Sequence, residues 1–354
     1  MESFTILPAI LIFILAFVVS SICIPLVIKL AKKRKLYDEN GGRHIHKGRI
    51  PRLGGIAIFF GLLFSQLYFV LNVQFTGNQL ESYLLLLFVL CLLFLLGLLD
   101  DLVNVRANFK FLIQLVVGFV IVVQADVRIT SLEGLFGVYE LPEIYSYTYS
   151  IILLVFLINA FNLIDGLDSL SSSLGIVVFS CFLYIFVFNN MYIESFLCIS
   201  VLGSLLGFWF YNKPPAKIFM GDSGTLGIGL LLAYCSLRLS SASLDLSGTV
   251  NPVIPMVILA YPAIDTLRVF TNRIVKGRSP FSPDRNHIHH ILYDLGLGHG
   301  IATIVIISTN TLIVAIVYCF RSNVNLSFWI ALVLTVVLSQ VPGYLLQKRK
   351  RLLN

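Results

Sequence analysis

Long stretches without a charged residue constrain this chain more than any other feature of its sequence. A helix needs about 20 apolar residues to cross a membrane, and about a quarter of the residues of a soluble domain are charged. Here only 12% are charged and 58% are hydrophobic. We therefore expect an all-α polytopic membrane protein, with residues 1–354 as a single membrane domain. Eleven stretches are predicted to be transmembrane helices: 4–28, 53–71, 83–99, 111–123, 147–163, 170–188, 196–211, 225–239, 252–269, 302–320 and 326–346.

The distribution of lysine and arginine predicts an orientation for these helices. With the N-terminus outside, the inner loops and the C-terminal tail hold 22 of the 25 basic residues, and the outer loops hold only Arg128, Arg238 and Arg321. Cytosolic loops of membrane proteins carry such an excess. We therefore expect an outer N-terminus and a cytosolic C-terminus. The net charge of +7 then reflects this bias and attraction to anionic membrane lipid, and no nucleic-acid partner is expected.

The first inner loop, residues 29–52, leads into a basic and glycine-rich stretch with the sequence GGRHIHKGRIPRLGG. The backbone amides of Gly54 and Gly55 could hold phosphate oxygens at the start of the second helix, with Lys47, Arg49 and Arg52 nearby. The alternative is a positively charged loop that only sets the topology, and this loop taken alone favours that alternative.

Two adjacent aspartates, Asp100 and Asp101, follow seventeen uncharged residues. Each of two neighbouring like charges raises the cost of ionising the other, unless a cation or a hydrogen-bond donor lies between them. The pair is therefore a candidate for a metal site or a phosphate site. The alternative is a pair of interfacial carboxylates that Arg106 and Lys110 neutralise.

The stretch NAFNLIDGLDSL carries Asn159, Asn162, Asp165 and Asp168 at a spacing of three residues. This spacing predicts that the four side chains lie on one face of a helix. Their oxygen atoms suit a hard cation, Mg²⁺ or Mn²⁺, and they do not suit zinc. The alternative is a capping cluster around Gly166.

The stretch KIFMGDSGTLGIG places Asp222 between Gly221 and Gly224, where the eighth predicted helix begins. Glycines allow a close approach of the backbone, and a carboxylate among them is more typical of a ligand than of a packing residue. The competing interpretation is a helix cap, which Ser223 or Thr225 could also form.

The last inner loop, residues 270–300, carries a histidine cluster among basic residues. No cysteine accompanies the histidines, and the neighbouring cations repel a metal, so a zinc site is disfavoured. Arginine and histidine beside turns favour anion recognition, of phosphates or a sugar ring. Asp265 precedes this loop and is expected to pair with Arg268. The residues of the loop expected to bind substrate are Arg278, Arg285, His287, His289 and His290.

The acidic residues of these motifs all lie at the cytosolic ends of their segments, and no charged residue or histidine lies in the middle of a segment. A secondary transporter would be expected to have ionisable groups and helix breaks near the membrane midplane. The pattern therefore favours chemistry at one interface. The active site is predicted to be formed by the cytosolic loops 29–52, 100–110, 162–168, 212–224 and 270–300.

Four motifs in this order, LDDLVNV, NAFNLIDGLD, FMGDSG and SPFSPDRNHIHH, resemble those of the polyprenyl-phosphate N-acetylhexosamine-1-phosphate transferases. The resemblance is strongest to the bacterial branch of undecaprenyl-phosphate N-acetylglucosamine-1-phosphate transferases. Ile288 interrupts the histidine cluster, which points away from the branch that makes the peptidoglycan lipid precursor. Ser169 departs from the glycine that members often have at this position.

The resemblance implies a reaction at the cytosolic face of the bacterial cytoplasmic (inner) membrane. UDP-N-acetylglucosamine and undecaprenyl phosphate would give undecaprenyl-pyrophosphoryl-N-acetylglucosamine and UMP, with Mg²⁺ or Mn²⁺ as the cofactor. The product would start the synthesis of a cell-envelope polysaccharide of the O-antigen or teichoic-acid type. A homodimer is left open.

The resemblance also implies roles for the residues at the motif positions. Asn162 and Asp222 correspond to metal ligands, and Lys110 to a lysine at the diphosphate. The residues with implied catalytic roles are Asp100 and Asp101 at the lipid phosphate and Asp165 and Asp168 in the second acidic motif. The residues expected to bind substrate are Lys47, Gly54, Gly55, Lys110, Asn159, Arg278, Arg285, His287, His289 and His290.

Other functions compete with this one. The same reaction with another UDP-N-acetylhexosamine is the nearest alternative. A transporter for a lipid-linked sugar is disfavoured by the lack of midplane charge. A CDP-alcohol phosphotransferase is disfavoured because its acidic motif is not found, and an inactive scaffold because all the acidic motifs are intact.

Overall fold

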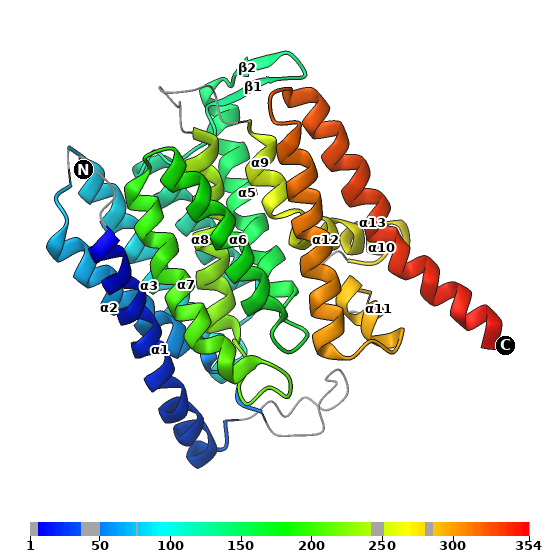
Figure 1. Cartoon of the computed structure of the whole chain (residues 1–354), viewed down its shortest axis with the longest axis horizontal. Helices are drawn as coiled ribbons and strands as arrows, with labels where there is room; N and C mark the ends of the chain where they lie inside the picture. The colour runs from blue at the N-terminus through cyan, green and yellow to red at the C-terminus, as the bar shows by residue number, and fades with distance from the viewer. Residues whose placement is uncertain (1–5, 37–49, 76, 242–250, 280–285, 354) are drawn as a thin grey trace.

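The computed structural model describes residues 6–36, 50–75, 77–241, 251–279 and 286–353, and it is a bundle of long helices with one β-hairpin (Figure 1). The strands β1 (Ser131–Leu135) and β2 (Val138–Glu140) pair antiparallel. The helices are α1 (Ile6–Arg34), α2 (Gly54–Asn72), α3 (Gln79–Val103), α4 (Ala107–Phe119) with its π-helical continuation η1 (Val120–Gln124), α5 (Glu143–Leu163), α6 (Leu170–Phe188), α7 (Tyr192–Asn212), α8 (Asp222–Ser241), α9 (Val253–Ile258), α10 (Ala260–Val275), α11 (Ile288–Asp294), α12 (His299–Cys319) and α13 (Val324–Leu353).

Nine stretches of the described chain are helical, long and apolar enough to cross a membrane: α1, α2, α3, α4 with η1, α5, α6, α7, α12 and α13. The prediction of an all-α polytopic membrane protein is thereby confirmed, apart from the small hairpin. The two other predicted segments are helical but lie outside these nine. Segment 225–239 lies within α8, and segment 252–269 is divided between α9 and α10.

Helix α8 lies at the centre of the bundle. All of its side chains from Ser223 to Leu237 are buried, and α2, α3, α5, α6 and α9 pack around it. A helix that is apolar on every side is stable only when other elements surround it. This position places the first residue of α8, Asp222, among the ends of several neighbouring helices.

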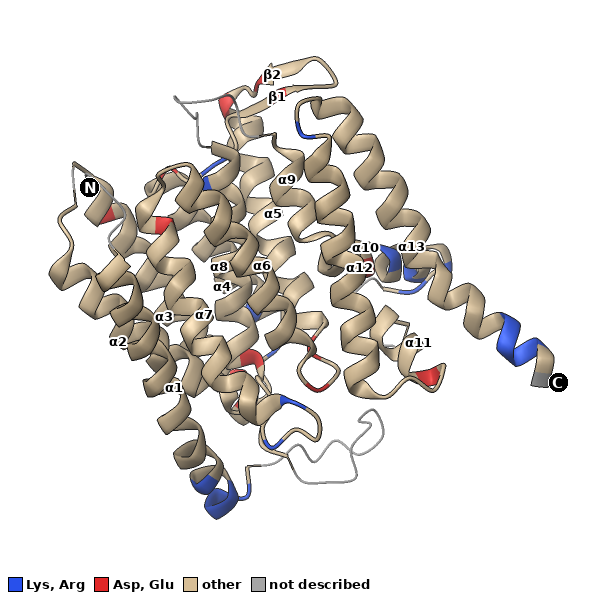
Figure 2. Ribbon diagram, in the orientation of Figure 1, with Lys and Arg blue, Asp and Glu red and all other residues tan. Residues whose placement is uncertain are grey.

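Charged residues are rare along the middle of the helices, as Figure 2 shows. Helices α1 and α13 both carry basic residues in their last turns, which are Lys32, Lys33 and Arg34 in α1 and Lys350 and Arg351 in α13. This agrees with the pattern from which the orientation was predicted. Which end of the bundle faces the cytosol stays a prediction.

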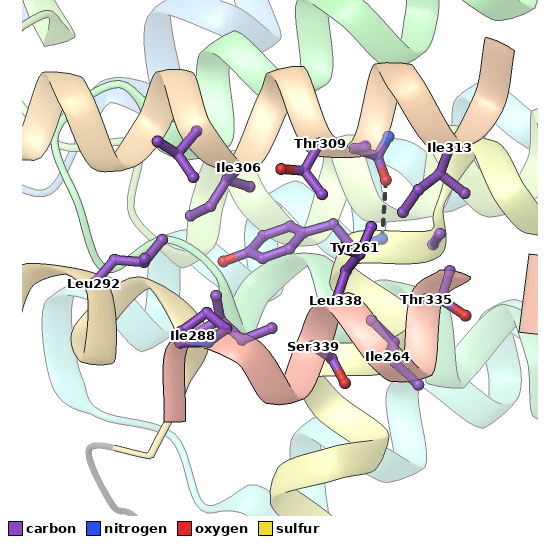
Figure 3. Close-up of a pocket in the computed structure, with 14 residues that line it drawn as sticks. Tyr261, Ile264, Ile288, Leu292, Ile306, Thr309, Ile313, Thr335, Leu338 and Ser339 are labelled. Atoms are coloured by element: carbon purple, nitrogen blue, oxygen red, sulfur yellow. Dashed lines mark hydrogen bonds between the residues drawn. The ribbon is translucent and has the colours of Figure 1, made fainter. Parts of the chain in front are cut away.

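The ninth predicted segment is broken between α9 and α10. Pro262 has no N–H to donate to the carbonyl oxygen of Ile258, four residues earlier, and a proline at this place interrupts a helix. Asn310 of α12 replaces the missing bonds. Its Nδ2 donates to the Ile258 carbonyl oxygen (3.2 Å), and its Oδ1 accepts from the N–H of Tyr261 (3.0 Å; dashed line in Figure 3).

The side chain of Asn310 also lines a largely apolar cavity between α10, α11, α12 and α13 (Figure 3). Tyr261, Ile306 and Leu338 line the same cavity. Asn310 is buried, so water cannot take over its two bonds to the backbone. The break in the helix therefore depends on this one side chain.

We predict that Asn310→Leu destabilises the protein by about 2 kcal/mol or more, because it leaves a buried N–H and a buried carbonyl without their partner. Thermal melting of the purified protein in detergent measures the effect. Thr309→Val is the matched control, since this near-isosteric change lies beside Asn310 on the same cavity wall. Equal melting temperatures of the two variants would contradict the role of Asn310.

Candidate active site

The turn before α8 contacts the start of α2 through two backbone hydrogen bonds. The N–H groups of Gly54 and Gly55 donate to the carbonyl oxygens of Phe219 (2.9 Å) and Met220 (2.8 Å). The structure therefore contradicts the expectation that these two amides hold a phosphate. A Cβ atom at Gly55 would lie 2.1 Å from the backbone nitrogen of Gly224, so glycine is needed here for close packing of the backbone.

Asp101 caps the N-terminus of α8. Its two carboxylate oxygens accept from the backbone N–H groups of Asp222 (2.8 Å) and Ser223 (3.0 Å). Gly221 has a φ of +72°, and a Cβ atom there would lie 1.9 Å from the carbonyl oxygen of Arg52 and 2.7 Å from Asp101. A carboxylate at the positive end of a helix is favourable. Asp101 therefore fixes the place of Asp222.

Lys110 of α4 joins two carboxylates that are far apart in the sequence. Its Nζ lies 2.8 Å from Oδ2 of Asp100 and 3.1 Å from Oδ2 of Asp222. The other oxygen of Asp100 accepts from the N–H of Val105 (2.7 Å). Of the alternative in which Arg106 and Lys110 neutralise the aspartates, the structure shows the ion pair of Lys110 with Asp100, whereas the side chain of Arg106 is exposed.

Asn162 and Asp222, the two expected metal ligands, are in contact. The Nδ2 of Asn162 donates to Oδ1 of Asp222 (3.0 Å) and to Oγ1 of Thr225 (2.7 Å). Among the described residues, no three His, Cys, Asp or Glu side chains are grouped as a metal centre would require. Mg²⁺ is commonly held by only one or two carboxylates, together with water and substrate phosphates. Asp222 and Asn162 both carry side-chain oxygen atoms that suit an ion bound in that way. Both oxygens of Asp222 face nitrogen donors in this structure, Nδ2 of Asn162 and Nζ of Lys110, and an ion would displace these contacts.

The expected helical face from 159 to 168 is interrupted. Helix α5 ends at Leu163, and the chain turns before α6, where Ser169 has a φ of +62°. Asp165 and Asp168 therefore lie beyond the helix that carries Asn159. The spacing of three residues predicted a helix, but glycine in the second half of the motif and the left-handed backbone at Ser169 allow a turn instead.

Asp165 and Asp168 have different partners. Asp165 accepts from the hydroxyl of Ser171 (2.5 Å), and burial raises the pKa of its carboxyl to about 6. Asp168 is buried, and its Oδ2 accepts from the N–H of Ala216 (3.0 Å). The backbone N–H of Asp168 donates to Nδ1 of His299 (3.1 Å). The sequence reasoning missed His299, which no motif singles out because it stands alone at the start of α12.

Asn159 pairs with Gln114 across the contact between α4 and α5. The Nδ2 of Asn159 donates to Oε1 of Gln114 (2.6 Å) and to the carbonyl oxygen of Val155 (2.8 Å). This pair lies one helical turn before Asn162. The expectation that Asn159 binds substrate stays a prediction.

The histidine segment lies against the second acidic motif. A Cβ atom at Gly166 would lie 2.3 Å from Nε2 of His289, so the two segments are in direct contact. The rings of His287, His289 and His290 neighbour one another. Burial lowers the pKa of His289 well below its ordinary value, so this side chain is neutral at pH 7. It therefore cannot supply the positive charge that was expected of the cluster.

Two of the remaining expected substrate-binding residues lie outside the described part of the chain, and the third is exposed. Lys47 and Arg285 lie outside the described residues. Arg278 lies exposed beyond the end of α10, and no hydrogen bond or ion pair joins its side chain to the other described site residues. The other predicted residues come from four of the five predicted loops, from the start of α2 (Gly54 and Gly55) and from α5 (Asn159). Hydrogen bonds or close contacts connect these four loops.

We predict that His289 makes the protein sensitive to mild acid. Its folded pKa is lowered, so the unfolded chain binds a proton that the folded chain does not, and stability falls as the pH drops below about 6.5. The loss amounts to about 1.4 kcal/mol for each pH unit below that value. His289→Gln should lose this part of the pH dependence.

Melting temperatures of both proteins at pH 8, 6 and 5 measure the difference. The titratable and charged neighbours of His289, which are His287, His290, Asp265 and Arg268, are the same in both proteins. A difference in melting temperature that stays constant across this range would contradict the prediction.

The sequence matches known proteins over nearly its whole length. Residues 83–240 match the model of glycosyl transferase family 4. The probable undecaprenyl-phosphate N-acetylglucosaminyl 1-phosphate transferase of Bacillus subtilis (strain 168) is 32% identical over 347 residues, which are 95% of this chain and 94% of that protein. The undecaprenyl-phosphate alpha-N-acetylglucosaminyl 1-phosphate transferase of Escherichia coli O157:H7 is 28% identical over 90% of this chain and 86% of its own. The Yersinia pestis protein of the same name is 28% identical over 91% and 87%.

The match to the Bacillus subtilis protein is both long and above 30% identity. The family model covers the start of α8 with Asp222 and the helix ends that carry Asp100, Lys110 and Asn162. The relatives are named as undecaprenyl-phosphate N-acetylglucosaminyl 1-phosphate transferases, and the family model describes a glycosyl transferase. The chain therefore belongs to glycosyl transferase family 4, among the polyprenyl-phosphate N-acetylhexosamine-1-phosphate transferases.

Proposed function

We propose that this protein transfers N-acetylglucosamine 1-phosphate from UDP-N-acetylglucosamine to undecaprenyl phosphate and releases UMP. We place the reaction at the cytosolic face of the bacterial cytoplasmic membrane, as the first membrane step of a cell-envelope polysaccharide. The names of the relatives support the acceptor and the sugar. The observation that carries the proposal is the junction of Asp100, Lys110, Asp222 and Asn162 where helix ends from α3, α4, α5 and α8 meet.

In the proposed reaction an oxygen of the lipid phosphate attacks the β-phosphorus of the UDP-sugar. A bond forms between that oxygen and the β-phosphorus, and the bond to the bridging oxygen breaks, so UMP leaves with the electron pair. The second pKa of a phosphate monoester is about 6, and the acceptor is therefore largely a dianion at pH 7. The protein then needs to align and neutralise two anions more than it needs a strong base.

The residues of the junction suit this task. Lys110 offers an ammonium between two carboxylates, and a phosphate could take the place of either one. Asp222 and Asn162 would hold Mg²⁺, or Mn²⁺, which when bound neutralises pyrophosphate charge. Asp100 would orient the lipid phosphate or accept its last proton. Asp101, occupied by two backbone amides, would act by holding Asp222 in place.

We predict that purified protein in detergent releases UMP only when undecaprenyl phosphate, UDP-N-acetylglucosamine and Mg²⁺ are all present. EDTA should abolish the release, and added Mg²⁺ should restore it. Asp222→Asn should lower kcat by about 100-fold or more, because one metal ligand loses its charge. Asp126→Asn is the control, since Asp126 is a 69% exposed carboxylate outside the site.

Two outcomes of this experiment would be decisive. A well-folded protein that releases no UMP with any UDP-N-acetylhexosamine would refute the transferase function. Release with a different UDP-N-acetylhexosamine alone would keep the reaction and correct the sugar.

We predict that Asp100→Asn and Asp101→Asn differ in their effects. An asparagine at 101 places an NH₂ group opposite a backbone N–H, so this variant should lose about 1–2 kcal/mol of stability together with activity. An asparagine at 100 can still accept a hydrogen bond from the N–H of Val105, and Lys110 keeps its ion pair with Asp222. This variant should lose activity with a smaller change in melting temperature. Near-normal UMP release by both variants would remove the aspartate pair from the mechanism.

A further inference from the structure

Asp265 of α10 is a completely buried carboxylate that the proposed reaction does not use. Its Oδ2 lies 2.8 Å from Nδ1 of His287, and its Oδ1 accepts from the backbone N–H of Ile288 (2.9 Å). The Nη2 of Arg268 lies 3.0 Å from the same Oδ1 and also donates to the carbonyl oxygen of Asn286. A buried carboxylate is tolerated only when it is paired and hydrogen-bonded. Apart from Arg268, the partners come from the segment that begins α11.

We infer that Asp265 is a positioning residue for the sugar-phosphate transfer, which acts by fixing the imidazole of His287 and the start of α11 against the 162–168 loop. The inference rests on the proposed function. It goes beyond the pairing with Arg268 that the sequence indicated, because it makes His287 the group through which Asp265 acts.

The contact with Asp265 sets the chemical state of His287. A carboxylate only accepts hydrogen bonds, so Nδ1 of His287 must carry the proton. Nε2 is then the ring atom that is left for a second contact. A carboxylate on the other nitrogen also fixes the orientation of the ring. His287 therefore presents its Nε2 atom in a fixed orientation.

The contact also sets the position of α11. The N–H of Ile288 is the first of this short helix, so Asp265 acts as its N-terminal cap from another helix. One residue further, Nε2 of His289 lies against Gly166. Two steps of direct contact thus connect Asp265 with the loop that carries Asp165 and Asp168.

The place of Asp265 is itself determined by the break between α9 and α10. Asp265 lies three residues after Pro262 and four after Tyr261. The N–H of Tyr261 donates to the side chain of Asn310. Because of the break, α10 does not continue the axis of α9. The direction of α10 determines where the carboxylate of Asp265 lies. A continuous helix through 252–269 would present a different register at position 265.

The first test measures position without using activity. Asp265→Asn replaces Oδ2 with an NH₂ group that faces the proton of His287. The contact with His287 and the cap at the N–H of Ile288 are therefore weakened. Hydrogen exchange measured by mass spectrometry should become at least tenfold faster in residues 286–294, with α2, α3 and α8 unchanged. Asp294→Asn, at the exposed end of α11, is the control and should leave the exchange as it is. Unchanged exchange in Asp265→Asn would overturn the inference.

The second test is a double-mutant cycle in UMP release with Asp265→Asn and His287→Asn. If Asp265 acts through His287, each single variant should lose about 10- to 100-fold in kcat/KM. Asp265→Asn should then cost less than threefold in the His287→Asn background. A purely structural role would make the two losses multiply, and that result would overturn the inference.

If Asp265→Asn does not fold, His287→Asn provides the test. It removes the imidazole that Oδ2 of Asp265 holds and leaves Asp265 and Arg268 in place. Exchange in residues 286–294 should rise about threefold, and no rise would overturn the inference. A folded wild-type protein that releases no UMP with any UDP-N-acetylhexosamine would instead refute the proposed function, and this inference with it.

Discussion

The site depends on one close backbone contact, in which the turn before α8 passes between α2 and α3. A Cβ atom at Gly55 would lie 2.1 Å from the backbone nitrogen of Gly224, and one at Gly97 would lie 2.3 Å from the carbonyl oxygen of Asp222, so both would collide with the first turn of α8. Because the helices approach so closely, the carboxylate of Asp101 can reach the first N–H groups of α8. The contact places Asp222 beside residues from α4 and α5, which the sequence separates by more than fifty positions.

The charge balance of this junction explains what it can bind. Two carboxylates share the ammonium of Lys110, and a third is stabilised by the N-terminus of α8. Among the contacts of the described residues, the ion pairs of Asp100 and Asp222 are both made with Lys110, and hydrogen bonds supply the rest. Arrival of a diphosphate would add negative charge and would require a further cation. Asp222 and Asn162 are the residues proposed to hold one, and Mg²⁺ prefers oxygen donors such as those of their side chains.

The broken helix between α9 and α10 shows how a membrane bundle can contain an irregular backbone. An unsatisfied backbone group costs several kcal/mol in the absence of water, so a break is tolerated only where a neighbour restores its hydrogen bonds. Asn310 does this for both sides of the break. The consequence reaches the site, because α10 carries the carboxylate that holds His287 and the start of α11.

The histidine segment illustrates why residue type alone does not define a role. Three histidines near basic residues indicate anion recognition, yet two of them, His287 and His289, are buried and have protein partners. Asp265 and Tyr261 are those partners, and both lie on α10. Burial removes charge from His289, so its contribution is shape and packing against Gly166.

The sequence by itself determined the class of protein and predicted where its chemistry would lie. Uncharged runs of helical length leave few options other than membrane helices, and the polar residues at their ends predicted the site, because polar groups are costly in a membrane. Tertiary structure decided what spacing cannot express. Gly54 and Gly55 suggested a phosphate cradle, but their amides face Phe219 and Met220. The regular spacing up to Asp168 indicated a helix, but the chain turns after Leu163. The partners of an amide, a carboxylate or an imidazole depend on which distant backbone lies beside it, and only the packing of the helices determines that.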